Sequence, residues 1–123
     1  MDSAGEIGAL LPLTPAVFHI LVVLAGGEAH GYAIMQEVDH MTGGQVQIGP
    51  GTLYRSIDRM LLDGLIEKAS SSADERRNVY RLSSRGRAVA RAESRRLEAL
   101  VRAARARGLL GTRAEGVSEE RRK

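Results

Sequence analysis

The sequence contains no cysteine and no tryptophan, and only 3 % of its 123 residues are aromatic. The absence of cysteine excludes a disulfide framework, a thiolate metal site and a cysteine nucleophile. Because the aromatic residues are one phenylalanine and three tyrosines, we expect an aliphatic core and no aromatic platform for stacking single-stranded nucleic acid. The length predicts one domain with short tails.

Long apolar segments are also missing. The longest apolar run, from Ile20 to Ala25, is too short to span a bilayer. No basic segment followed by an apolar one opens the chain, so we expect no signal peptide. The predicted location is therefore the cytoplasm, without a membrane partner.

Basic residues are absent from the first half of the chain. The first 54 residues hold five acidic side chains and no lysine or arginine, whereas all 18 basic residues follow from Arg55 onward. Eight arginines and two glutamates lie between Arg85 and Arg107. Such a separation of charge favours contact between one surface and a polyanion. A solvated helix face explains the arginines of residues 85–107 equally well, and both interpretations stay open for that stretch.

The residue sets that enzymes use are not found. The chain has no plausible Ser/His/Asp constellation and no glycine loop followed by Lys-Ser/Thr for phosphate. His19, His30 and His40 are eleven and ten residues apart, without a supporting carboxylate pair. We therefore expect no enzymatic activity, no metal site and no cofactor.

Start and stop signals predict two helices in the first half of the chain. Thr14-Pro15 is typical of a helix start, and Gly26-Gly27 of a helix end. A second helix is expected from Tyr32 to about Met41. The alternation in Gln45–Ile48 indicates a very short strand or an extended linker.

The third helix is the most clearly predicted element. Gly49-Pro50-Gly51-Thr52 is a start signal, and Asp63-Gly64 a stop. Apolar residues recur between them at helical spacing and form one stripe. These residues are Leu53, Ile57, Met60 and Leu61.

A hairpin and a long helix complete the pattern. Residues 65–69 and 78–83 are expected as two strands joined by a charged loop. The last helix is predicted from Ser83 or Ser84 to Arg107, and its narrow apolar side favours packing against a partner. The sequence therefore predicts a mainly α (α+β) winged helix-turn-helix with a long C-terminal dimerisation helix. We assign residues 1–9 to a flexible tail, 10–83 to a DNA-binding domain, 84–107 to the dimerisation helix and 108–123 to a disordered tail.

The third helix carries most of the candidate DNA-binding residues. In a winged helix-turn-helix this helix enters the major groove with its N-terminal residues nearest the bases. The hydroxyls of Thr52 and Ser56 can bond phosphates or bases, and Arg55 and Arg59 can fork onto guanine or clamp phosphates. Arg76 and Arg77 are expected at the tip of the wing, although neighbouring carboxylates weaken that case.

These residues also carry a resemblance to a known family. The matching segments are Leu13-Thr14-Pro15, His30-Gly31-Tyr32, Gly49-Pro50-Gly51-Thr52-Leu53-Tyr54, Leu61-Leu62-Asp63-Gly64-Leu65-Ile66 and Arg76 to Ser83, followed by Gly86. Together they resemble the short form of the PadR family of bacterial transcriptional regulators, over about residues 13–107.

The resemblance implies a dimeric repressor that binds double-stranded operator DNA and is released by a small-molecule effector. It places Tyr32, Thr52 and Tyr54 at the DNA surface. It also implies that the last helix of one chain packs against the first helix of the other. The dimer interface would contain Leu10, Leu11, Leu13, Val17, Leu97, Leu100, Val101 and Ala104. A tryptophan-lined drug site, as in some relatives, is not expected because the chain has no tryptophan.

One alternative belongs to another functional class. Winged helices also serve as protein-interaction or ligand-sensing modules that bind no operator, and a fold does not determine function. Such a module would more often present an apolar patch on the third helix. The basic face of this helix favours DNA binding.

Overall fold

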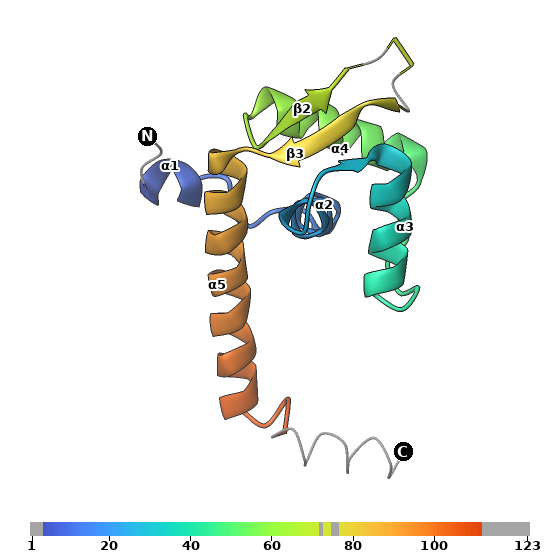
Figure 1. Ribbon diagram of the computed structural model, residues 1–123. Coiled ribbons are helices and arrows are strands. Elements are labelled where there is room, and N and C mark those ends of the chain that lie inside the picture. Colours follow the sequence, from blue (N-terminus) through green and yellow to red (C-terminus); the bar gives the residue numbers. More distant parts are fainter. Residues whose placement is uncertain (1–3, 72, 75–76, 112–123) are drawn as a thin grey trace. The chain divides into compact units, whose positions relative to one another are not determined.

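A computed structural model of the chain describes residues 4–71, 73–74 and 77–111. It contains three antiparallel strands in the order β1-β3-β2, together with five helices among these residues (Figure 1). This arrangement confirms the predicted winged helix-turn-helix with a long C-terminal helix. The elements are α1 (Ala4–Gly8), α2 (Pro15–Ala25), β1 (Ala29–His30), α3 (Gly31–Met41), α4 (Pro50–Leu62), β2 (Ile66–Ser70), β3 (Val79–Leu82) and α5 (Ser84–Ala106).

The chain forms two compact units, and the boundary between them lies within α5. The first unit ends at Glu93, and the second begins at Ser94. The first unit contains the three helices of the helix-turn-helix and the whole sheet. No helix in the described part of the chain is both long enough and apolar enough to cross a membrane.

Local capping explains where the main helices begin. The Thr14 hydroxyl accepts a hydrogen bond from the Val17 backbone N–H at 3.2 Å, and Pro15 takes the first helical position of α2. The Ser83 hydroxyl accepts a hydrogen bond from the Gly86 N–H at 2.9 Å. Of the two candidates for the cap of α5, the structure therefore selects Ser83.

The core of the first unit lies where α2 packs against α3, α4 and β3. The predicted stripe of α4 points into it: Leu53, Ile57 and Met60 are buried, and Leu61 is half-buried. Tyr80 of β3 is 1 % exposed and belongs to this core. The remaining buried hydrophobic residues are aliphatic: Ile20, Leu21, Leu24, Ile34, Val38, Ile48, Leu65, Ile66 and Val89.

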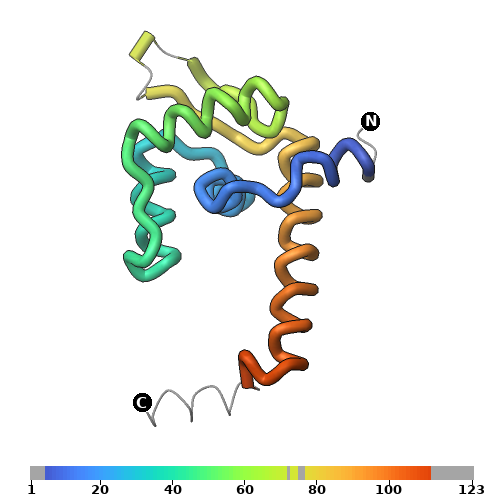
Figure 2. The backbone as a smooth tube through the Cα atoms, turned by 180° about the vertical axis from the view of Figure 1, so that it is seen from behind, coloured from blue at the N-terminus to red at the C-terminus, as the bar shows by residue number. Residues whose placement is uncertain are grey.

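A tight turn leads from α3 to α4. Gly43 and Gly44 adopt φ angles of 60° and 82°, a conformation that favours glycine. The Thr42 hydroxyl donates to the Val38 carbonyl at 2.8 Å and accepts from the Val46 N–H at 3.0 Å. The chain then returns alongside α3 to the start of α4 (Figure 2). Of the two predictions for Gln45–Ile48, the extended linker is confirmed.

The N-terminal segment differs from the prediction. The expected flexible tail over residues 1–9 is wrong for Ala4–Gly8, which form α1. Ile7, Leu10, Leu11 and Leu13 pack against the core of the same chain. These contacts are tertiary, so the local sequence pattern did not indicate them.

The sheet also differs in detail. β1 was not predicted, because a strand of two residues has no alternation to detect. It pairs with β3 through Ala29 opposite Tyr80 and His30 opposite Val79. The first strand of the predicted hairpin runs from Ile66 to Ser70, one residue later than expected.

Candidate nucleic-acid interface

The outer face of α4 gathers four of the predicted DNA-binding residues. Thr52, Arg55 and Arg59 are exposed, and Ser56 is half-buried. At 3.6 residues per turn these four positions fall within an arc of about 100° around the helix. The opposite side of α4 is its buried stripe, so the core fixes which face the helix presents to solvent.

The first turn of α4 adds backbone donors to this face. It contains no acidic residue, and the N-cap residue Gly49 makes no side-chain capping bond. Within the described residues, the backbone N–H groups of Gly51 and Thr52 have no hydrogen-bond partner. Such a helix start carries a partial positive charge and suits a phosphate oxygen.

The two arginines of the α4 face are held differently. Nη2 of Arg55 lies 3.5 Å from Oγ1 of Thr52, a weak contact between two exposed side chains. Nε of Arg59 donates to Oδ2 of Asp63 at 3.2 Å, one helical turn further along. Arg55 therefore keeps more conformational freedom than Arg59.

The two predicted tyrosines occupy unlike positions. Tyr32, in the first turn of α3, is 63 % exposed. Tyr54 is half-buried, and its ring lies against the start of α3: a Cβ atom added to Gly31 would be 2.7 Å from the Tyr54 hydroxyl oxygen. Packing against the start of α3 is thus a structural role of Tyr54. The contact brings the His30-Gly31-Tyr32 and Thr52-Leu53-Tyr54 segments together in space.

The wing carries basic residues at its exposed positions. Arg77 is exposed two residues before β3, and its backbone N–H donates to the Asp74 carbonyl at 2.9 Å. Arg76 lies outside the described residues. Lys68 of β2 is exposed and was missed from the sequence, although its place in a predicted strand of the wing was a usable signal.

Arg81 belongs to a different environment on the sheet. Its Nε donates to Oε1 of Glu67 at 3.1 Å, and Nη1 lies 3.7 Å from Oε2 of Glu28. The hydrogen bond and charge of Glu67 raise the pKa of Arg81, with a smaller contribution from Glu28. The guanidinium is therefore neutralised within the chain and is a poor candidate for a phosphate contact.

A close junction sets the wing against the start of α5. Gly86 packs so tightly on the backbone of Leu65 that a Cβ atom would come within 1.9 Å of the Leu65 carbonyl oxygen. The Ser83 hydroxyl donates to the Gly64 carbonyl at 2.6 Å, and Gly64 itself has a φ angle of 75°. This contact gives a physical reason for the Asp-Gly-Leu-Ile segment and the later Gly86.

The predicted dimer residues fall into two groups. Leu10, Leu11, Leu13 and Val17 are half-buried against the core of their own chain. The three leucines therefore have a place in a single chain, because α1 and the following segment pack against its core. The Leu13 N–H also donates to the buried carboxylate of Glu93 at 2.9 Å.

The second group lies on α5 beyond Glu93. Leu97 and Ala104 are half-buried, whereas Leu100 and Val101 are 59 % and 42 % exposed. Their spacing places all four along one side of the helix. Gly108, with a φ angle of 81°, ends this helix as predicted.

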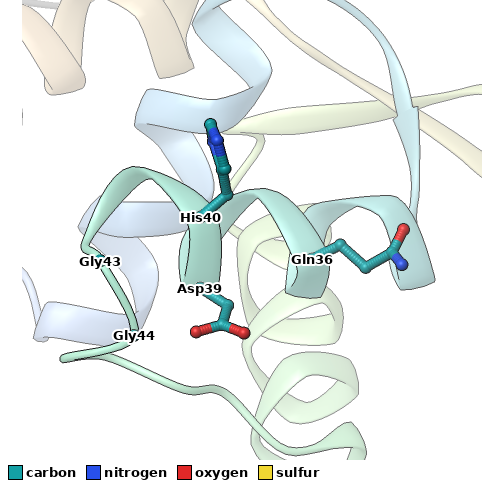
Figure 3. A pocket seen from close by; sticks show the side chains of 5 residues that line it. All are labelled: Gln36, Asp39, His40, Gly43 and Gly44. Atoms are coloured by element: carbon teal, nitrogen blue, oxygen red, sulfur yellow. The ribbon is translucent and has the colours of Figure 1, made fainter.

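A shallow depression lies at the end of α3 and is lined by Gln36, Asp39, His40, Gly43 and Gly44. The side chains of Asp39 and His40 point away from each other (Figure 3). Within the described residues, no three His, Cys, Asp or Glu side chains lie close enough to hold a metal ion. The depression therefore offers no converging set of ligands.

Comparison with known proteins agrees with this geometry. The model of the PadR-like family of transcriptional regulators matches residues 20–92. The chain belongs to this family. Its members are transcriptional regulators and not enzymes, and the matched segment contains α3, α4 and the wing.

Individual relatives support the same assignment. The chain is 38 % identical over 85 residues to transcriptional regulator Rv3488 of Mycobacterium tuberculosis, a match that covers 68 % of this chain and 77 % of the relative. The structure of RosR from H. salinarum is 32 % identical, with a TM-score of 0.58, and the match covers 75 % of this chain and 77 % of that one. A transcriptional regulator from Clostridium thermocellum shares the fold, with 22 % identity, a TM-score of 0.64 and coverage of 84 % and 94 %.

Proposed function

We propose that this PadR-like regulator is a homodimeric repressor that reads a two-fold operator sequence through α4. The observation that carries the proposal is the exposed polar face of α4, with Thr52, Arg55, Ser56 and Arg59 beside unpaired backbone N–H groups. The arginines supply forks for guanine or phosphate, and the hydroxyls supply shorter contacts. Because the buried stripe fixes the orientation of α4, these groups can enter a major groove together.

The wing would add contacts that position the protein without reading bases. Lys68 is exposed on β2, and Arg77 is exposed two residues before β3. Basic side chains at such positions bind phosphates and make the affinity depend on salt. Tyr32 belongs to the same proposed surface, and Tyr54 would approach it from its place against α3; Arg76, a candidate from the sequence, lies outside the described residues. The domain containing these residues is the proposed DNA-binding domain, residues 10–83.

Dimerisation is proposed through α5, within residues 84–107. Leu100 and Val101 expose apolar surface that a second α5 or the N-terminal segment of a second chain would cover. Leu97, Ala104, Leu10, Leu11, Leu13 and Val17 would add the apolar surface that remains accessible on them. Two copies related by a two-fold axis would place their α4 helices in successive major grooves, with half-sites ~34–36 Å apart.

We also propose that a small molecule releases the repressor from DNA, because the family resemblance implies such an effector. The cytoplasm is the proposed location, since the protein must reach the DNA. No described cavity carries a set of groups that identifies an effector class, and the depression in Figure 3 lies outside the proposed interface.

The test is fluorescence anisotropy with a labelled duplex from the upstream region of the protein's own gene. A scrambled duplex of equal length is the control, at ~50 and ~200 mM salt, where several phosphate contacts change the affinity strongly. Preference for the native duplex at the higher salt supports a sequence-specific regulator. Equal binding to both duplexes contradicts sequence-specific readout of this DNA, and no binding favours the protein-interaction alternative.

A further inference from the structure

The carboxylate of Asp63 is the only acidic group that bonds a proposed DNA-reading side chain within the described residues. It accepts a hydrogen bond from Nε of Arg59 at 3.2 Å. The Arg59 side chain is nonetheless 69 % exposed. The bond to Asp63 uses Nε, and the two terminal nitrogens make no hydrogen bond within the described residues. They remain available to an acceptor on DNA.

Asp63 is itself held firmly. Its backbone N–H donates to the Arg59 carbonyl at 2.9 Å, and its carbonyl accepts from Nε of Arg85 at 3.0 Å. Gly64 follows with a φ angle of 75°, which turns the chain away from α4. The Asp63 side chain is 23 % exposed. The backbone that carries the carboxylate is therefore held in place, one helical turn from the exposed arginine that it bonds.

Stability does not explain an aspartate at this position. A helix C-terminus carries a partial negative charge, which makes a carboxylate unfavourable there. An exposed ion pair four residues apart contributes little, and least with the acid on the C-terminal side. A carboxylate on the DNA-facing helix also repels phosphates. What distinguishes Asp63 is its bond to Arg59, a side chain on the face proposed to meet DNA.

We propose that Asp63 is a positioning residue that orients the Arg59 guanidinium for a guanine base in the major groove. The inference rests on the proposed function, because it says how Arg59 is oriented for base readout by α4. A guanidinium held through Nε presents its terminal N–H groups to the paired acceptors of a guanine edge, O6 and N7. Fixing the side chain beforehand removes part of the ordering cost at binding.

The main variant is Asp63→Asn, and Asp58→Asn is its matched control. Asp58 is an exposed acid on the same helix that forms no ion pair within the described residues, so both variants remove one negative charge. The measured quantity is the ratio of dissociation constants for scrambled and native duplexes. We expect Asp63→Asn to lower this ratio by ~2–10-fold, as expected for one less ordered side chain. Asp58→Asn should leave the ratio unchanged.

Two further variants test whether Asp63 acts through Arg59. In an Arg59→Ala background, the added Asp63→Asn change should not lower the ratio further, because residues in one network are not additive. Arg59→Lys keeps the charge but lacks the fork. It should lower the ratio while the salt dependence of binding stays the same. Arg59 is exposed, so this variant remains informative even if Asp63→Asn fails to fold.

Each outcome separates the inference from the proposed function. A wild type that does not prefer the native duplex overturns operator reading and the inference with it. A wild type with preference, but an Asp63→Asn ratio within two-fold of that of Asp58→Asn, overturns the inference alone. The inference is also overturned if Asp63→Asn lowers the ratio equally in the wild-type and Arg59→Ala backgrounds, since Asp63 would then act independently of Arg59. An Arg59→Lys variant that keeps the wild-type ratio contradicts guanidinium readout.

Discussion

Substitution of Gly86 by alanine tests the packing that sets the wing against α5. A Cβ atom at this position would lie 1.9 Å from the Leu65 carbonyl oxygen, 2.8 Å from its carbon and 3.3 Å from its Cα. The clash is with backbone, so no side-chain rotation relieves it. The backbone cannot move easily either, because Ser83 bonds the Leu65 and Gly64 carbonyls at 3.1 and 2.6 Å.

The expected loss follows from the size of this overlap. Overpacking in cores costs ~1–3 kcal/mol and sometimes more. Because the contact is far below a van der Waals distance, we expect a loss of about 3 kcal/mol, at the upper end of that range. For a domain of this size the melting temperature should fall by roughly 12–24 °C. The assay is thermal unfolding followed by circular dichroism, at one protein concentration because dimerisation would shift the transition.

Gly51→Ala is the matched control for this experiment. Gly51 lies in the first turn of α4, and a Cβ atom there would have no neighbour within 4 Å. Alanine favours helix over glycine by up to about 1 kcal/mol, so this variant should be equal to the wild type or more stable. If Gly86→Ala melts within about 4 °C of the wild type, a shift worth less than about 1 kcal/mol, the close approach of α5 to Leu65 is refuted.

Three further predictions concern the wing, the dimer and the core. Lys68→Ala should weaken binding to native and scrambled duplexes alike and reduce the salt slope by about one, as measured by anisotropy across salt concentrations; an effect on the native duplex alone would contradict a phosphate contact. Leu100→Asp should convert the proposed dimer to a monomer in analytical ultracentrifugation, because it places a charge on the exposed apolar side of α5; an unchanged sedimentation mass would exclude this face. Ile57→Ala removes a fully buried side chain and should cost about 2–5 kcal/mol in urea unfolding; a loss below about 1 kcal/mol would contradict its place in the core.

The features that the sequence predicted well are those set by neighbouring residues. The start of α2 follows from Thr14-Pro15, and α4 follows from its proline and its stripe of Leu53, Ile57 and Met60. Both are local signals, since a cap and a periodic stripe act within one or two turns. The exposed face of α4 could be predicted for the same reason, because it is the side opposite the stripe.

The features that were missed depend on contacts between distant parts of the chain. β1 exists because Ala29 and His30 pair with β3, some fifty residues later. α1 lies against the core through Ile7, an isolated apolar residue in a segment without periodicity. The bond between Arg59 and Asp63 was within reach of the sequence, since residues four apart share a helix face. The Asp63-Gly64 pair by itself indicates only a helix stop, which says nothing of the aspartate side chain.

The most direct test of operator reading by α4 is a base-substitution scan of the native duplex with the wild type and Arg55→Ala. Each base pair is changed in turn, and the affinity is measured by anisotropy at fixed salt. We expect a two-fold pattern of sensitive positions, with half-sites ~34–36 Å apart. Arg55→Ala should cost about 1–3 kcal/mol and lose discrimination at one position in each half-site. Uniform weakening across all duplexes, or a change below ~0.5 kcal/mol, would contradict base readout by Arg55.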